Sequence, residues 1–400
     1  MFVFGKKSTE VVVGDGPPSN SEEPIAITAI GFCCPVGGTA WEAALALRKR
    51  NSAFSQHETV LVAEDRYRTL LRGATISRTP DAKFPACLEG AERAVALLAP
   101  AIRDCIVGLD LNLKRQLLWN LDNLLTPDET EFHRHLNNSL SDLYLPQFAQ
   151  EQKAQGLPSR CTFFERIIAA AGRLRRGGVE EPPQIVGCVD SLCAAQKLQE
   201  LSLAGKLKSA VNPDGIMAGE AAGVILMERE SDARRRGAHV LATIASWGRG
   251  TEEQTRNPGK PATGGGLTAA FQEAFVNLDD GGQSVGMVIA DLNGERARAV
   301  DWAYTESRVF PSTEPNLKHP ADTLGDCGGA MGAAILLQGL ASLILHGHGP
   351  RRIALCTSDE AGARRVIVLQ TGKLLNRRVL LSDIRYRAGK GAGIPAEKEA

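Results

Sequence analysis

The chain has 400 residues and carries 46 lysines and arginines against 46 aspartates and glutamates, so its formal net charge at pH 7 is zero. This balance excludes the broad basic face with which proteins bind nucleic acid or anionic lipid surfaces. An apolar fraction of 43% is enough for a large core. The nine cysteines are scattered, without the paired spacing of a zinc site or the density of a disulfide scaffold. We therefore expect free thiols in a cytoplasmic protein, with no metal and no cofactor.

The two ends of the chain differ in composition from its middle. Residues 1–23 contain prolines, serines and acids with few apolar anchors, and they are predicted to be a flexible tail, as are residues 388–400. The N-terminal stretch is too short and too polar for the apolar segment of a signal peptide. The longest apolar run, Gly328–Leu345, is rich in glycine and alanine and contains Gln338. This composition favours a helix packed inside the protein over a membrane span.

Between the tails, short apolar runs bounded by glycine or proline alternate with stretches of helical periodicity. In chain order, the expected elements are strand 25–31, helix 41–50 with Thr39 as its N-cap, helix 89–106, strand 105–111, helix 163–176, strands 185–189, 221–227 and 240–247, helix 267–278, strand 285–291, helix 328–345, and strands 353–357 and 365–369. This alternation predicts an α/β protein of two successive halves, residues 24–235 and 236–387, each a mostly parallel sheet with helices on both faces.

Three segments carry a recognisable pattern of glycines and acids. Residues 27–37 read I-T-A-I-G-F-C-C-P-V-G, residues 186–191 read V-G-C-V-D-S, and residues 214–224 read D-G-I-M-A-G-E-A-A-G-V. In order and spacing they resemble the motifs of the ketosynthase branch of the thiolase superfamily. The resemblance spans residues 25–370 and implies a thiolase-like fold with duplicated α/β halves in αβαβα layers. It also implies a variable helical insertion within 112–160 and a homodimer.

Cys161 is the candidate nucleophile. A ketosynthase attacks an acyl thioester with a cysteine thiolate at the N-terminus of a buried helix, where free backbone N–H groups and the helix dipole lower the thiol pKa. The resemblance places Cys161 there, ahead of a helix that ends near Gly177. Phe163 and Phe164 follow where the family has small residues, and their rings would crowd the turn. The alternative is a buried thiol without a catalytic role.

The two catalytic histidines of the family are replaced. Asn293 takes the place of the first, and it can donate a hydrogen bond to an oxyanion but cannot shuttle a proton. Asp326 takes the place of the second, and Ala321 stands where the family has a lysine. An aspartate would oppose a developing oxyanion unless protonated. The phenylalanine gate of the family is absent from residues 357–362, which contain Ser358 and Asp359.

The replacements fall where the fold would place its central pocket. If the polar side chains converge, they form a pocket that binds a ligand or a cation, or performs acid/base chemistry of a different kind. The alternative is that they cap helices and pair with Arg296 or Arg298. The predicted pocket residues are Asn293, Glu295, His319, Asp322, Asp326, Ser358 and Asp359.

Two functions follow from the resemblance. The first is a catalytically degenerate ketosynthase-like binding or assembly protein, since residues 291–296 and 319–326 resemble those of thiolase-like proteins encoded beside type VI secretion genes. Its partners would be secretion cargo or spike proteins, for which it would serve as an adaptor. The second is an acyltransferase or β-ketoacyl synthase-type enzyme that uses Cys161 on acyl carrier protein or coenzyme A thioesters.

Overall fold

A computed structural model describes residues 23–64, 66, 70–79, 88–125, 128–143, 145, 159–176, 181–253, 263–345 and 351–371. Apart from Glu23, the predicted tails 1–23 and 388–400 lie outside these residues, as does Cys87. The eight cysteines within them are all free and buried. One stretch of the described residues, Gly328–Leu345, is long and apolar enough to cross a membrane, and 89% of it is buried inside the fold.

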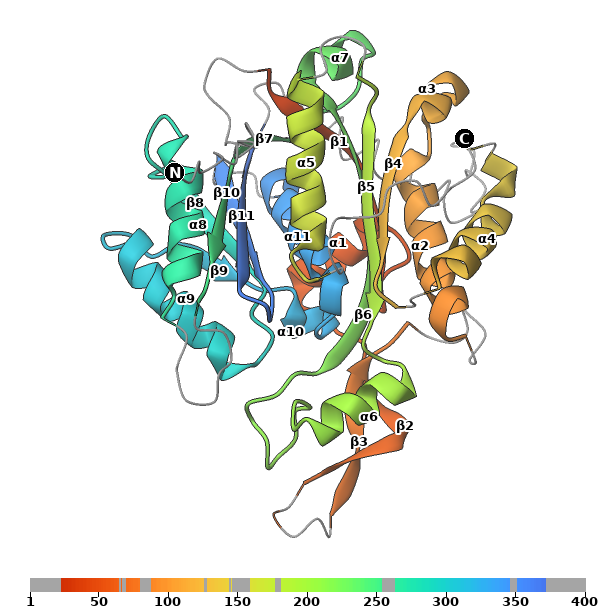
Figure 1. Cartoon of the computed structure of the whole chain (residues 1–400), viewed down its shortest axis with the longest axis vertical. Helices are drawn as coiled ribbons and strands as arrows, with labels where there is room; N and C mark the ends of the chain where they lie inside the picture. The colour runs from red at the N-terminus through yellow and green to blue at the C-terminus, as the bar shows by residue number, and fades with distance from the viewer. Residues whose placement is uncertain are drawn as a thin grey trace, which may run out of the picture.

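Eleven strands form one connected sheet, and helices cover it (Figure 1). The strands are β1 (Ile25–Cys33), β2 (Phe54–Ala63), β3 (Leu71–Ser77), β4 (Leu118–Asn123), β5 (Gln184–Ser191), β6 (Ala218–Arg229), β7 (Ala242–Thr251), β8 (Val285–Ala290), β9 (Asn316–Lys318), β10 (Arg352–Ser358) and β11 (Ala363–Gln370). The α-helices are α1 (Ala40–Lys49), α2 (Gly90–Ile106), α3 (Leu111–Gln116), α4 (Glu129–Ser139), α5 (Thr162–Arg176), α6 (Ala195–Leu203), α7 (Glu230–Arg235), α8 (Gly265–Val276), α9 (Arg296–Val309), α10 (Ala321–Leu324) and α11 (Met331–Leu345), with short 3₁₀ turns η1 (Ser141–Leu143) and η3 (Gly328–Ala330).

The two halves of the sheet repeat one plan. In the first half, β4 pairs parallel with β5, β5 antiparallel with β6, and β6 antiparallel with β1. In the second half, β8 pairs parallel with β10, β10 antiparallel with β11, and β11 antiparallel with β7. β1 and β7 pair antiparallel, with Ile25 opposite Ile244, and join the halves. The predicted duplication of α/β halves is therefore visible in the pairing itself, but the expectation of mostly parallel sheets is wrong, because two of the three pairings named in each half are antiparallel.

Helices and sheet alternate in five layers, as expected. α5 and α11 lie between the two halves of the sheet and contact strands of both, β5 and β11 for α5, and β6 and β10 for α11 (Figure 1). α2 and α4 cover the outer face of one half, and α8 and α9 cover the other. The middle position explains why α11 is apolar all round, since a helix with sheet on both sides has no solvent face.

In each half, the outer helix packs closely against a glycine of the sheet. A Cβ on Gly31 of β1 would lie 1.9 Å from the backbone oxygen of Ala101 in α2. A Cβ on Gly248 of β7 would lie 1.9 Å from the backbone oxygen of Ala270 in α8. Both approaches need a residue without a side chain, because real Cβ atoms do not come this close to backbone oxygen.

Two local features that the sequence predicts, an N-cap at Thr39 and a strand at 105–111, have different outcomes in the structure. The N-cap is confirmed, because Thr39 Oγ1 accepts from Glu42 N at 3.3 Å. The strand expected at 105–111 is wrong: α2 continues to Ile106, Gly108 has a φ of +79°, and Asp110 caps the next helix by accepting from Leu113 N. An apolar run with a glycine turn inside it fits a helix-to-helix connection as well as a strand.

The range 112–160 is only partly helical. It contains α4, which packs on α2, but also β4, which is a strand of the main sheet. The sequence analysis did not predict β4, because this strand contains Asn120, Asp122 and Asn123, which are typical of loops. These polar groups are buried and partnered, with Asn120 Nδ2 donating to Gln184 Oε1 at 3.2 Å.

Candidate functional site

Cys161 lies immediately before α5, at the start of a helix of the middle layer. Its backbone carbonyl accepts the first helical bond, from Glu165 N at 3.0 Å. The turn into the helix is fixed by two crossed bonds: Ser159 Oγ accepts from Cys161 N at 3.2 Å, and Thr162 Oγ1 accepts from Ser159 N at 2.6 Å. The helix therefore starts where the resemblance places it, with Cys161 1% exposed.

The surroundings of the Cys161 thiol oppose its ionisation. Burial raises the pKa of this thiol most, and the carboxylates of Asp359 and Asp291 raise it further, against two arginines of β11 that lower it. Sγ donates to the backbone oxygen of Ala363 at 3.4 Å. The thiol is therefore protonated at neutral pH, the opposite of what a helix N-terminus does for a reactive cysteine.

Phe163 and Phe164 fill the space beside the helix start. They are 1% and 0% exposed, and both rings lie against Gly332 of α11. The crowding that the sequence predicts at this turn takes the form of tight packing between α5 and α11.

We expect Cys161 in the folded protein to resist alkylation by iodoacetamide from about pH 6 to about pH 9, because the reactive species is the thiolate and burial raises its pKa. The measurement is the alkylated fraction of the Cys161 peptide by mass spectrometry, with urea-unfolded protein as the positive control. Cys188, another buried thiol of raised pKa, is the internal reference. Labelling of Cys161 much faster than Cys188 would contradict a protonated thiol.

Asp326 is fully buried and held by an arginine that precedes the candidate nucleophile. Nη1 and Nη2 of Arg160 donate to its two carboxylate oxygens at 2.6 and 2.9 Å, and Gly328 N donates to Oδ1 at 2.9 Å. Burial alone would raise the pKa of Asp326, but the charge and hydrogen bonds of Arg160 outweigh it and hold that pKa below its ordinary value. Asp326 is therefore an ionised partner in a bidentate ion pair.

Asn293 follows β8 and connects Asp326 to a second carboxylate. Its amide nitrogen donates to Asp326 Oδ2 at 2.6 Å and to Glu295 Oε2 at 3.0 Å. Glu295 N donates back to Asn293 Oδ1 at 3.1 Å. Both amide hydrogens of Asn293 are thereby used, so it has none left for a bound oxyanion.

Arg298, at the start of α9, forms the other centre of the network. Its guanidinium donates to the carboxylate of Asp291, to Ser358 Oγ at 2.8 Å and to the Ser358 carbonyl at 3.1 Å. Its Nε donates to Glu295 Oε2 at 3.3 Å. This Glu295–Arg298 ion pair agrees with the alternative interpretation of the sequence, in which the polar residues pair with Arg298 and stabilise the fold.

The turn between β10 and β11 is fastened to both arginines. Glu360 Oε1 lies 3.3 Å from Arg160 Nε and 3.3 Å from Arg298 Nη2. Asp359 Oδ1 accepts from Ala363 N at 2.8 Å within the same turn. Ser358 and Asp359 thus hold this turn in place, and Glu360, 42% exposed, forms the outer end of the network.

His319 and Asp322 do not join this network. His319 Nδ1 lies 2.8 Å from Asp322 Oδ1, and both residues line a separate cavity together with Lys318 and Arg48. The predicted cluster therefore divides: Asn293, Glu295 and Asp326 meet, whereas His319 and Asp322 lie elsewhere. The cause is α10, which separates His319 from Asp326 and turns the two segments apart.

Four residues of the network were not predicted as site residues, namely Arg160, Asp291, Arg298 and Glu360. Arg298 was named in the sequence analysis as a pairing partner, and the signal of the other three was their position within two residues of Cys161, Asn293 or Asp359. Within the described part of the chain, no histidine is hydrogen-bonded to Cys161, Asn293 or Asp326. The centre is a set of mutually satisfied ion pairs, an arrangement that fixes segments in place and offers no imidazole for proton transfer.

Comparison with known proteins places this geometry in a wider fold. No protein-family model and no curated protein matches the chain. A type II PKS acyl-carrier protein in complex with its ketosynthase, bound to the hexaketide, matches with a TM-score of 0.71 and 13% identity, over 88% of this chain and 100% of that one. A ketosynthase from module 6 of the bacillaene synthase from Bacillus subtilis 168 matches with a TM-score of 0.69 and 13% identity, over 88% of this chain and 73% of that one. The ishigamide ketosynthase/chain length factor matches with a TM-score of 0.65 and 17% identity, over 88% and 100%. At these identities the likeness concerns the fold, and the chain has the thiolase-like fold of the ketosynthases.

Proposed function

We propose that this protein is a catalytically degenerate ketosynthase-like protein that acts as a binding or assembly factor. The observation that carries the proposal is the buried Arg160–Asp326 ion pair. The resemblance implies that Asp326 takes the position of a catalytic histidine of the condensing enzymes. A guanidinium does not release its proton at neutral pH, and an aspartate paired with it does not take one up. With a protonated thiol at Cys161, neither a nucleophile nor a proton relay is available for condensation.

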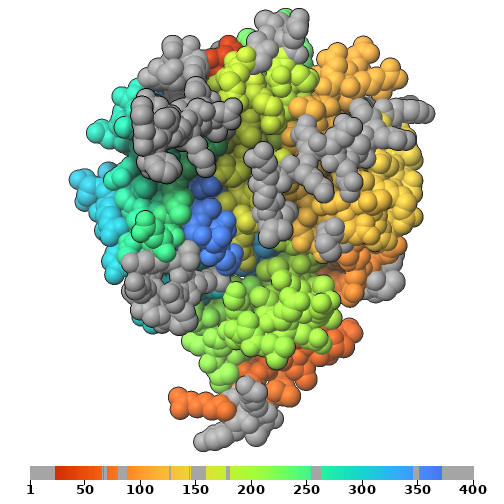
Figure 2. Space-filling model, viewed as in Figure 1, coloured from red at the N-terminus to blue at the C-terminus, as the bar shows by residue number. Residues whose placement is uncertain are grey.

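A projecting lobe supplies a surface for a partner. It consists of β2, β3 and α6, has a small core of its own, and extends from one end of the molecule (Figure 2). Large apolar side chains on it face solvent, with Leu70, Leu71 and Leu203 exposed by 61%, 51% and 91%. Leu70 and Leu71 are adjacent in the chain, and contiguous exposed apolar side chains are typical of protein interaction sites.

The kind of partner is inferred from the similarity of two sequence segments to those of other proteins. The segments D-L-N-G-E-R at 291–296 and H-P-A-D-T-L-G-D at 319–326 are similar to those of thiolase-like proteins encoded beside type VI secretion genes. We infer an adaptor that holds secretion cargo or a spike protein before export. The network described above is where these two segments meet, through Asn293 and Asp326.

We expect the lobe to bind such a partner. Co-purification with cargo and spike proteins encoded nearby should recover a complex with the wild-type chain and lose it with Leu203→Glu, because a charge replaces an apolar contact. Leu111→Glu, at another exposed leucine on α3, is the matched control and should keep the complex. Failure of the wild-type chain with every partner, or equal loss in both variants, would count against this surface.

A second function has one observation in its favour. Cys161 lies at the start of α5, and one protein of similar fold is a ketosynthase in complex with its acyl carrier protein. Under this alternative, Cys161 accepts an acyl group from an acyl carrier protein or coenzyme A thioester.

Intact-mass measurement separates the two functions. After incubation with malonyl- and acyl-loaded carrier protein, we expect no covalent adduct, because the thiol stays protonated and enclosed. An adduct on the wild-type chain and on the Cys188→Ala control that disappears in Cys161→Ala would overturn the non-catalytic proposal in favour of acyl transfer.

A further inference from the structure

A cavity of about 260 Å³ with basic walls lies between α1, β9, α10 and the C-terminal half of α11. Arg48, Arg50 and Lys318 line it, and among the described residues none of the three forms an ion pair. The carboxylate that lines it belongs to Asp322, which is already paired with His319. The lining therefore carries positive charge that the surrounding protein does not balance.

The two arginines act on the charge of Lys318. Burial lowers the pKa of Lys318 most, and the charges of Arg48 and Arg50 lower it further. Bringing like charges together around a cavity is unfavourable unless something of opposite charge enters it. A bound anion would relieve this repulsion and interact with all three side chains at once.

Arg50 reaches the cavity from a strained backbone. It ends α1 in the left-handed region, with a φ of +54°, and in the described residues it is the one non-glycine residue with positive φ. Helices usually place glycine at this position, because a side chain is disfavoured there. An arginine that keeps such a conformation and points to a basic cavity indicates a use for its side chain.

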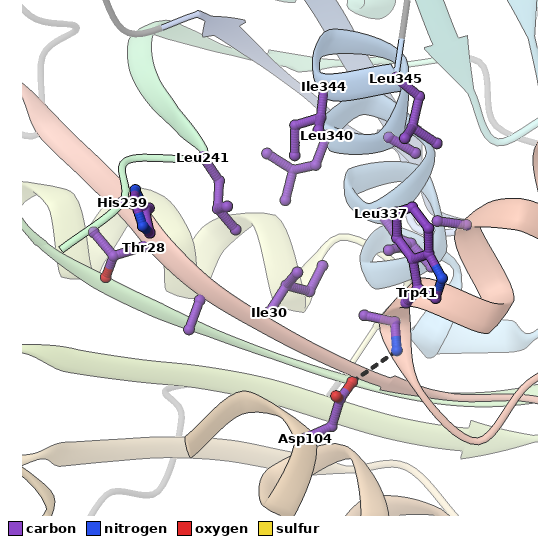
Figure 3. A pocket seen from close by; sticks show the side chains of 14 residues that line it. Thr28, Ile30, Trp41, Asp104, His239, Leu241, Leu337, Leu340, Ile344 and Leu345 are labelled. Atoms are coloured by element: carbon purple, nitrogen blue, oxygen red, sulfur yellow. Dashed lines mark hydrogen bonds between the residues drawn. The ribbon is translucent and has the colours of Figure 1, made fainter. Parts of the chain in front are cut away.

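An apolar groove continues from the basic cavity along α1 and α11. It encloses about 70 Å³ and shares Ala44, Ala341 and Leu345 with the basic cavity. Figure 3 shows Trp41 of α1 beside Leu337 of α11, with Leu340 and Leu241 farther along the groove. The lining thus changes from cationic in one cavity to mostly apolar in the adjoining one, whose polar residues are Thr28, Asp104 and His239.

We propose that the two cavities form one binding site for an anionic amphiphile, a molecule with a phosphate or carboxylate head and an apolar chain. The head lies among Arg48, Arg50 and Lys318, and the chain lies in the groove beside Trp41. Gln338 lines the basic cavity, and its side-chain oxygen has no hydrogen-bond partner in the described residues. It accepts a hydrogen bond from a phosphate monoester head that keeps one proton. The site shares no residue with the Arg160–Asp326 network and does not depend on the proposed function.

Isothermal titration calorimetry of the full chain tests the site with decyl phosphate, decanoate, decanol and inorganic phosphate, each amphiphile below its micelle concentration. We expect at least one of the two anionic amphiphiles to bind, and more tightly than decanol and inorganic phosphate do. Preference for decyl phosphate indicates a phosphate ester as the natural ligand, and preference for decanoate indicates a fatty acid. The proposal is overturned if neither anion binds, if decanol binds as tightly, or if inorganic phosphate binds as tightly as decyl phosphate.

Variants locate the binding within the molecule. Lys318→Gln and Arg50→Gly should each weaken it at least about tenfold, since a charged hydrogen bond is lost. Arg50→Gly keeps the left-handed backbone, so its fold and melting temperature should hold. Ala341→Phe should block the junction of the two cavities. Arg115→Gln, at an exposed arginine on α3, is the control and should bind like wild type. Unchanged affinity in Lys318→Gln and Arg50→Gly would place any bound anion elsewhere and reject the site.

Discussion

Asp326→Asn is expected to lower the free energy of unfolding by about 3 kcal/mol, because it leaves the Arg160 guanidinium buried without its main counter-charge. Arg160 is 13% exposed and Asp326 0%, so solvent cannot take over the lost interaction. Glu360 remains 3.3 Å from Arg160, which places the effect at the lower end of the range for a broken buried pair. Chemical denaturation followed by circular dichroism measures the change.

A second substitution distinguishes a lost counter-charge from general disruption. Adding Arg160→Met to Asp326→Asn removes the stranded charge, and most of the lost stability should return. The Arg103–Asp142 pair is the surface control, with side chains 39% and 60% exposed, and Asp142→Asn should cost less than about 1 kcal/mol. If the double variant were less stable than Asp326→Asn alone, the ion pair would not be the cause.

The pH dependence of this pair has a definite sign. The folded protein holds the pKa of Asp326 below its ordinary value of 3.8, so the unfolded chain takes up a proton at higher pH than the folded protein does. The pair's contribution is therefore complete above about pH 5 and is lost as the pH falls through the folded pKa. The stability difference between wild type and Asp326→Asn should shrink below about pH 4.

Gly248→Ala is expected to have an effect of similar size, about 3 kcal/mol of lost stability, at the upper end of ordinary overpacking. The new Cβ would lie 1.9 Å from the Ala270 backbone oxygen and 2.7 Å from Ala274 N, both in the main chain of α8. Relief requires α8 to move away from β7, and that movement opens the core behind it. Gly31→Ala should behave alike, because Gly31 faces α2 in the same way.

Gly265→Ala is the matched control for this substitution. Gly265 begins α8, is exposed, and its added Cβ would meet nothing nearer than Thr263 Oγ1 at 3.3 Å. Its stability should change by less than about 1 kcal/mol. Equal effects of Gly248→Ala and Gly265→Ala would show that the close approach of α8 and β7 is not the cause of the lost stability.

The buried strands and the long helices could be predicted because their periodicity reports directly on burial. Strand β5 is buried along its whole length and helix α11 along most of it, and each was expected within a few residues of its observed bounds. β4 could not be predicted, because its polar groups obtain their partners from elsewhere in the chain. Asp122, for example, is paired with Arg166 of α5, at 2.9 Å between Oδ1 and Nη2. The lobe strands β2 and β3 were missed for a related reason: half-exposed alternation gives a weaker signal than continuous burial.

The sequence by itself determined the fold, because glycines, acids and apolar runs are local features that can be identified without knowing which segments meet in space. Tertiary structure decided which side chains meet. Arg160 and Asp326 are 166 residues apart and come together because α5 and the segment before α11 share the middle layer. His319 is only seven residues from Asp326, yet it faces another cavity. Ion pairs depend on distance in space, and that distance is fixed by how the layers stack.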